Sequence, residues 1–175
     1  MLVLIGKSGS GKTTIEDLLI KKYGMRRAIS HTTRPMRESD VDGVNYYFVS
    51  TEEMERLNRE NQLAERIEYL GNVYGFIKDE CKNDRVAVVA PDGFRQLLEK
   101  DDLDIFSVYL EVNPEIRKER MSGRGDSDEN VKIRMENDDL IFDGVNTKVD
   151  ICINNDNKTI EEITDLIWEL YCNAK

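Results

Sequence analysis

The stretch Gly6-Lys7-Ser8-Gly9-Ser10-Gly11-Lys12-Thr13 decides the fold of this chain. It matches the phosphate-binding pattern in which a glycine is followed, after four residues, by Gly-Lys-Thr. The apolar run at residues 2–5 is typical of a buried parallel strand, and apolar residues at helical spacing follow the loop. Its glycines let backbone N–H groups turn inward, and the start of a helix adds partial positive charge. The stretch therefore predicts a phosphate-binding loop; an ordinary glycine-rich turn is the alternative.

The composition favours one acidic globular domain. The chain has 175 residues, of which 39% are hydrophobic and 34% charged, and its formal net charge is −10. This charge makes nucleic acid an unlikely partner class, and no run approaches the roughly 20 apolar residues of a membrane span. The three cysteines, Cys81, Cys152 and Cys172, suggest neither a metal site nor a disulfide framework. We therefore expect a cytoplasmic protein without a signal peptide, since the chain begins directly in a strand.

Strands alternate with helices along most of the chain. Apolar runs predict strands at residues 85–90, 105–111 and 149–153, and periodicity with capping signals predicts helices at 12–23 and 128–142 and others from Asn113 and Thr159. This alternation predicts a parallel sheet with helices on both faces. A strand-rich stretch at 46–76 and a glycine-flanked helix around 124–142 interrupt it. Because ligands bind at the carboxyl ends of parallel strands, both interruptions are expected to border a site beside the loop.

A second stretch is more specific than the loop. Ser30-His31-Thr32-Thr33-Arg34-Pro35-Met36-Arg37, followed by residues 42–50 (DGVNYYFVS), resembles the guanylate kinase family. The resemblance covers nearly the whole chain, including residues 72–75 (NVYG) and 122–126 (SGRGD). It implies an α/β P-loop three-layer fold with a central parallel sheet, a small mixed α/β acceptor-binding insertion and a helical lid. In this single domain the core would comprise residues 1–30, 77–118 and 145–175, the insertion 31–76 and the lid 119–144.

The resemblance also implies an activity, the Mg²⁺-dependent transfer of the γ-phosphoryl group from ATP to GMP. The catalytic residues would be Lys12, Arg120, Arg124 and Arg134, and Thr13 would bind the metal. ATP would be bound by Gly6, Ser8, Gly9, Ser10, Gly11, Lys12, Thr13, Thr14 and Asn154. GMP would be bound by Ser30, Arg34, Arg37, Tyr46, Glu65 and Tyr74. A general base is not required, because the acceptor is itself a phosphate whose second pKa is about 6.

The chain departs from the family pattern around the acceptor base. Phe76 stands where the family usually has a small hydroxyl residue that touches guanine, and Val88 and Ala90 stand where it has two aspartates. These changes weaken recognition of the base and organisation of the metal, but they leave the phosphate contacts intact. A kinase of the same fold that acts on another nucleoside monophosphate or on a phosphorylated sugar therefore remains an alternative. A non-catalytic protein-binding module is disfavoured by the intact loop and lid arginines.

Each site assignment has an ordinary alternative. Arg34 and Arg37 could form surface ion pairs with Glu38 and Asp40, and the lid arginines could belong to a solvated charged face.

The expected partners are the two nucleotides, and the chain would act as a monomer or a homodimer.

Overall fold

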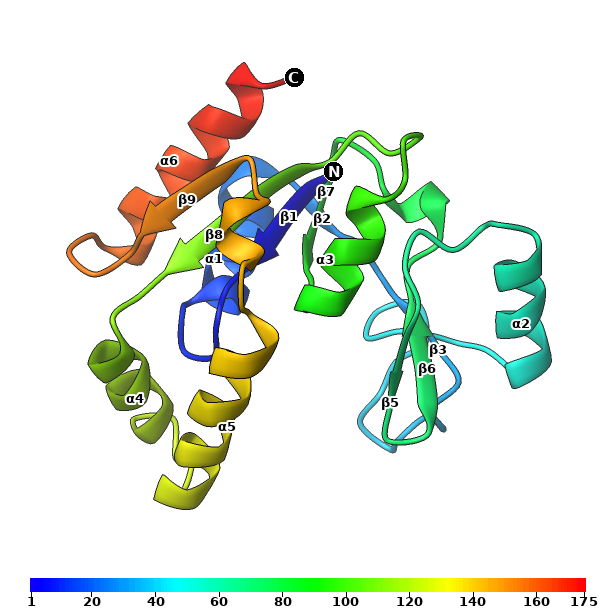
Figure 1. Cartoon of the computed structure of the whole chain (residues 1–175). Helices are drawn as coiled ribbons and strands as arrows, with labels where there is room; N and C mark the ends of the chain where they lie inside the picture. The colour runs from blue at the N-terminus through cyan, green and yellow to red at the C-terminus, as the bar shows by residue number, and fades with distance from the viewer.

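A five-stranded parallel sheet forms the centre of the computed structural model, which describes all 175 residues (Figure 1). Its strand order is β2-β7-β1-β8-β9, and every neighbouring pair is parallel. The strands are β1 (Leu2–Ile5), β2 (Arg26–Arg27), β7 (Arg85–Val88), β8 (Phe106–Glu111) and β9 (Ile151–Asn154). The predicted parallel sheet is thus confirmed. The edge strand β2 has only two residues.

The sheet is the middle of three layers because β1 is buried on both faces. Leu2 and Leu4 pack into a core with α1 (Lys12–Tyr23) and α6 (Ile160–Asn173). Val3 and Ile5 point to the opposite face and pack with α3 (Pro91–Leu98). This arrangement follows from the period-two geometry of a strand, which sends successive side chains to opposite faces. None of the six helices combines the length and the apolar composition that a membrane span requires.

The helix boundaries follow the capping signals in most places. α1 ends at Gly24, whose φ of 70° suits glycine. α4 (Pro114–Ser122) begins after Asn113, and α6 begins with a complete capping box at Thr159. Residues 50–53 also have the sequence of a capping box before α2 (Thr51–Arg59), but this box is only half formed. Its cap residue accepts a hydrogen bond from the backbone of Glu53, whose carboxylate binds Arg56 instead of returning to the cap.

A second, four-stranded sheet lies beyond the central one. Its order is β4-β3-β6-β5, formed by β3 (His31–Thr32), β4 (Tyr47–Phe48), β5 (Ile67–Tyr69) and β6 (Asn72–Gly75). A tight turn at residues 70–71 joins β5 to β6, which pair in antiparallel orientation. The short helix η1 (Lys78–Glu80) leads back to the central sheet. The mixed α/β character predicted for this insertion is therefore present.

Two further helices extend from the other side of the central sheet. Figure 1 shows α4 and α5 (Asp128–Ile141) at the lower left and the second sheet with α2 at the right. The short helix η2 (Val145–Thr147) connects α5 to β9. The elements expected to hold the two nucleotides thus lie on different sides of the molecule. The exact domain boundaries, 31–76 and 119–144, stay predictions.

Candidate functional site

The phosphate-binding loop connects β1 to α1, as its sequence predicts. Lys12 folds back over the loop, where its Nζ donates hydrogen bonds to the carbonyl oxygen of Gly6, to that of Lys7 at 3.0 Å and to Ser10 Oγ at 3.4 Å. Glycine is required at position 9, because a Cβ there would lie 2.7 Å from the carbonyl oxygen of Arg117. The close approach of α4 to the loop therefore depends on the absence of this side chain.

A small polar pocket brings the loop and the predicted lid arginines together. It has a volume of about 170 Å³, and its lining contains no hydrophobic residue. The lining residues are Ser8, Gly9, Gly11, Lys12, Thr13, Thr14, Arg124 and Arg134. Arg120 lies at the edge of the loop, where its guanidinium donates to the carbonyl oxygens of Gly9 and Asn155, both at 3.4 Å. Positive charge from three parts of the chain therefore gathers around one space.

The electrostatics of this pocket suit an anion. The pKa of Lys12 falls from 10.5 to about 8, chiefly because the side chain is buried and also because Arg134, Arg124 and Arg117 repel its charge, while Asp138 opposes the shift. The unliganded site thus disfavours a charged lysine, since nearby cations repel it and water is excluded. A bound phosphate would supply the missing counter-charge. The arrangement can hold the phosphates of a nucleotide at the start of α1.

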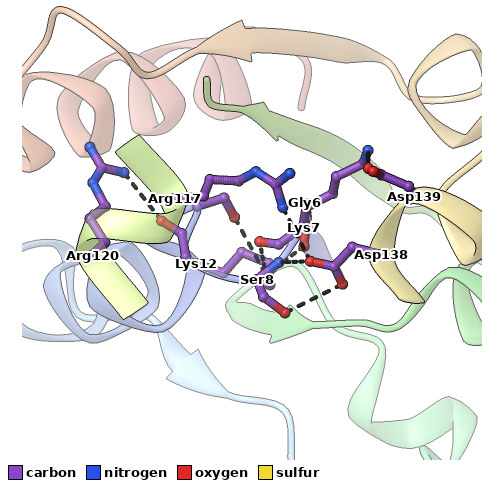
Figure 2. A network of polar contacts seen from close by, with 10 residues as sticks. Gly6, Lys7, Ser8, Lys12, Arg117, Arg120, Asp138 and Asp139 are labelled. Carbon is purple, nitrogen blue, oxygen red and sulfur yellow. Dashed lines mark hydrogen bonds and ion pairs between the residues drawn. The ribbon is translucent and has the colours of Figure 1, made fainter. Parts of the chain in front are cut away.

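Sequence reasoning missed a buried polar network beneath the loop. Figure 2 shows Asp138 reaching from α5 to Ser8, while Asp139 lies against Lys7. Asp138 accepts the backbone N–H of Ser8 at 2.6 Å and pairs with Arg117 at 3.2 Å. Because the Arg117 side chain is only 2% exposed, this pair is enclosed by protein. One signal was available, since Asp138 follows the buried Val131 by two helical turns and shares its face.

A second missed contact lies at the end of β9. The predicted adenine-site residue Asn154 is exposed and donates its amide to Asp156 at 3.0 Å. Its neighbour Asn155 is fully buried and donates instead to the carbonyl oxygen of Ser10 at 3.1 Å. Asn155, which the sequence did not single out, therefore supports the loop, and the role of Asn154 in ATP binding stays a prediction.

A larger cavity lies between the second sheet and the central sheet. Its volume is about 420 Å³, and four of the six predicted acceptor residues line it. These four are Ser30, Tyr46, Glu65 and Tyr74. The remaining lining is mainly apolar and includes Val89 together with Phe76, Val88 and Ala90, the three positions where the chain departs from the family pattern.

The two predicted acceptor arginines differ in their placement. The Arg34 guanidinium stacks over Tyr46, 5.6 Å from the ring centroid, and pairs with Asp40 at 2.8 Å. The ion pair that was considered as an alternative is therefore present, but it lies beside the cavity, and the side chains of both partners are only 11% exposed. Arg37 is exposed, and its backbone N–H, not its guanidinium, bonds to Asp40.

Glu65 is the single carboxylate in this cavity. Its Oε1 accepts the backbone N–H of Phe76 at 3.1 Å, whereas the buried Oε2 has no hydrogen-bond partner. Burial raises the pKa of Glu65 from 4.5 to about 7, and the Phe76 N–H only partly opposes this shift. Gly93 also matters here, because a Cβ at this position would lie 3.0 Å from Oε2. An orphaned acceptor of this kind marks a place for a ligand donor.

The two cavities have no lining residue in common. The structure therefore brings Lys12, Thr13, Arg124 and Arg134 together in one place and Ser30, Tyr46, Glu65 and Tyr74 in another. It does not bring the two groups into contact.

Comparison with known proteins agrees with this architecture. The model of the guanylate kinase family matches residues 1–170. A guanylate kinase of Mycoplasma mycoides is 32% identical in an alignment of 179 positions, which covers 95% of this chain and 60% of that protein. A guanylate kinase of Bartonella henselae is 32% identical over 146 residues, which cover 78% of this chain and 65% of that protein. The chain thus spans less than two thirds of the length of these relatives.

A solved structure supports the fold. The crystal structure of guanylate kinase from Anaplasma phagocytophilum superposes with a TM-score of 0.67 over 99% of this chain and 84% of that one. The sequence identity in this match is 22%, so it speaks for the fold alone.

Proposed function

This chain belongs to the guanylate kinase family, and we propose that it transfers the γ-phosphoryl group of ATP to GMP, which yields ADP and GDP. The observation that carries the proposal is the polar pocket in which Lys12 and Thr13 face Arg124 and Arg134. Phosphoryl transfer needs alignment and positive charge around the γ-phosphoryl oxygens more than it needs proton transfer. That pocket offers such charge at the start of a helix.

On this proposal the second cavity receives GMP. Guanidinium groups bind phosphate oxygens in a bidentate manner, so Arg34 and Arg37 suit the acceptor phosphate, with hydroxyls from Ser30, Tyr46 and Tyr74. Glu65 would then accept N–H donors of guanine. We propose that the acceptor-binding insertion comprises residues 31–76 and that the lid comprises residues 119–144. When GMP binds, Arg34 would leave its ion pair with Asp40 and bind the phosphate of GMP instead.

The residues present fit a magnesium ion that arrives with ATP. Mg²⁺ in such sites keeps several waters and uses one or two protein groups together with substrate phosphates. Thr13 is exposed in the phosphate pocket and offers one hydroxyl oxygen. Mg²⁺ would supply positive charge to the phosphate oxygens. The absence of a cluster of three His, Cys, Asp or Glu side chains is compatible with this mode, which needs no such cluster.

A second candidate function is supported by the lining of the acceptor cavity. Phe76, Val88 and Ala90 offer no hydrogen bond from their side chains, so base recognition rests largely on Glu65. A kinase of this fold that acts on another nucleoside monophosphate or on a phosphorylated sugar is therefore the alternative. A non-catalytic protein-binding module would not require the intact set of Lys12 and lid arginines.

The first experiment is to measure ADP release from ATP with GMP, dGMP, AMP, CMP, UMP and dTMP as acceptors. We expect a strong preference for GMP, which would support the first proposal. Turnover with another acceptor alone would favour the second candidate. A folded protein that binds ATP but uses none of these acceptors would contradict both nucleoside monophosphate kinase proposals, and a phosphorylated sugar would then be tested as the acceptor.

A second experiment separates the two sites. Arg134→Ala should lower kcat by a factor on the order of 10³ or more, as removal of arginine from a phosphoryl-transfer site does, with little change in GMP affinity. Lys132→Ala is the matched control, because Lys132 lies on the same helix, is exposed and does not line the pocket. Arg34→Ala should instead mainly raise the KM for GMP. An unchanged kcat in Arg134→Ala would refute the lid assignment.

A further inference from the structure

The acceptor cavity contains an unusual combination of an isolated carboxyl group and apolar walls. Glu65 lines it, is only 5% exposed, and has no charged partner. A Cβ added to Gly93 would lie 3.0 Å from Oε2, 3.0 Å from Val89 Cγ1 and 3.1 Å from Ile67 Cδ1, so α3 and these apolar side chains lie close to the carboxyl group. In such apolar surroundings, the ionised and the protonated form of a carboxyl group can have similar populations near neutral pH. Its pKa of about 7 agrees with this expectation.

The backbone decides which oxygen carries the proton in the neutral form. Oε1 already accepts the N–H of Phe76 at 3.1 Å, so it must keep a lone pair directed at that donor. Oε2 has no partner and is free to take the proton. The ionised form of Glu65 therefore offers two acceptors, whereas the neutral form offers a donor at Oε2 and an acceptor at Oε1.

We propose that Glu65 lets the acceptor site use two classes of purine monophosphate. The first class presents two N–H donors, as GMP does with its N1–H and its 2-amino group. The second presents an acceptor nitrogen beside an amino group, as 2-aminopurine riboside 5′-monophosphate does. The inference rests on the proposed function, because it concerns the acceptor of the same phosphoryl transfer.

Each class matches one form of the carboxyl group. Ionised Glu65 accepts both donors of guanine. Protonated Glu65 donates from Oε2 to N1 of 2-aminopurine and accepts from its 2-amino group at Oε1. A mismatched pair would leave a buried donor or acceptor unpaired, which costs about 1–3 kcal/mol.

The rest of the lining does not oppose the second class. 2-Aminopurine lacks the 6-oxygen of guanine, so it needs no donor at that position. The inner walls from Phe76, Val89 and Ala90 are carbon and lose no hydrogen bond when the oxygen is absent. The site therefore has little besides Glu65 with which to distinguish these two bases.

The elements around the cavity carry other charged or titratable side chains. They include Tyr46, Arg66, Glu68, Tyr69, Tyr74, Cys81, Asp92 and Arg95, as well as Arg85, which pairs with Glu80 at 3.3 Å. Arg66 pairs with Glu55 at 3.0 Å and with Glu68 at 2.9 Å, and the guanidinium of Arg95 pairs with Asp92 at 2.8 Å. Burial raises the pKa of Cys81 to about 11, which leaves its thiol uncharged near neutral pH. None of these groups donates to Oε2.

The test is the ratio of kcat/KM for 2-aminopurine riboside monophosphate to kcat/KM for GMP, measured between about pH 6 and about pH 8. Both acceptors carry the same phosphate, so titration of the phosphate, of Lys12 and of the lid cancels in the ratio. Since kcat/KM reports the form of the free enzyme, the ratio should rise about tenfold for each unit that the pH falls. A ratio that does not change with pH would overturn the inference.

Two variants sharpen the result. Glu65→Gln keeps a carbonyl oxygen opposite the Phe76 N–H and places an amide donor where Oε2 was, so it imitates the protonated form at every pH. We expect this variant to prefer 2-aminopurine and to lose the pH dependence of the ratio. Glu68→Gln is the control, because it removes an exposed carboxylate nearby that does not line the cavity. It should keep the dependence.

The outcomes also distinguish this inference from the proposed function. Turnover of GMP with a flat ratio would overturn the inference alone, as would equal losses for both acceptors in Glu65→Gln. If neither acceptor is turned over, the proposed function fails. The ratio of affinities is then measured through quenching of 2-aminopurine fluorescence and its displacement by GMP. A pH-independent ratio of affinities would overturn the inference, and a tenfold slope would support it.

Discussion

At Glu65, burial raises the pKa from 4.5 to about 7, so this residue also affects folding. The folded state binds more protons than the unfolded state between these values, and stability therefore falls as the pH rises through this range. The loss is complete above the folded pKa and amounts to at most about 3 kcal/mol. Relative to the wild type, Glu65→Gln should gain up to this amount between about pH 4.5 and about pH 8. Urea unfolding at several pH values measures it, and parallel stability curves would contradict it.

Gly93 acts on the same cavity through its missing side chain. A Cβ there would lie 3.0 Å from both Glu65 Oε2 and Val89 Cγ1, so Gly93→Ala must displace the wall or the carboxylate. We expect a higher KM for GMP and unchanged ATP affinity. The fold should survive, because alanine is favoured over glycine in a helix by about 1 kcal/mol. An unchanged KM in a variant with normal thermal stability would show that this contact does not position Glu65.

At the scale of elements, Asp138 fixes α5 to α4 through its ion pair with Arg117 and to the phosphate loop through the backbone N–H of Ser8. Asp138→Ala leaves Arg117 buried without its partner and should cost about 3–5 kcal/mol of unfolding free energy. Adding Arg117→Met removes the unpaired charge and should recover most of this loss. Chemical denaturation of the two single variants and the double variant measures the coupling. A double variant as unstable as the sum of the single variants would mean that the pair is not coupled.

The phosphate loop could be predicted from the sequence, whereas the contact between α4 and α5 could not. The loop residues Lys12 and Thr13 are adjacent in a contiguous motif, so their local geometry follows from the sequence. Arg117 and Asp138 lie 21 residues apart on two polar helices, and nothing local reveals that packing will bury both. The contact of Asn155 with Ser10 was missed for a similar reason. Side chains alternate in direction along a strand, and nothing local shows that the residue after β9 will be buried against the loop.

Element types were predicted better than their ends. The span of α1 and the Asn113 cap of α4 follow from strong local signals. The predicted strand at residues 85–90 ends two residues earlier, at Val88, and Ala90 is the N-cap of α3, whose first residue is Pro91. Proline is favourable in the first turn of a helix, where its missing N–H would have no partner. The apolar run alone could not show where this change occurs.

For the whole molecule, the separation of the two cavities has a consequence for catalysis. Direct phosphoryl transfer requires the acceptor oxygen to approach the γ-phosphoryl group, yet the phosphate pocket and the acceptor cavity share no lining residue. The second sheet is joined to the core through residues 28–30 and the segment around η1. We therefore expect these connections to act as a hinge that lets the second sheet and α2 move toward α5 when both nucleotides bind.

Small-angle X-ray scattering can test this movement. A compact chain of 175 residues has a radius of gyration of about 16 Å, and the free protein should exceed this value. A ligand in which adenosine and guanosine are joined by a polyphosphate occupies both sites at once and should lower the radius toward the compact value. ATP alone serves as the control, because it fills only the pocket at Lys12 and does not connect the two sides. A radius that stays the same at saturating linked ligand would mean that the sites do not close on each other, and direct transfer between them would then be untenable.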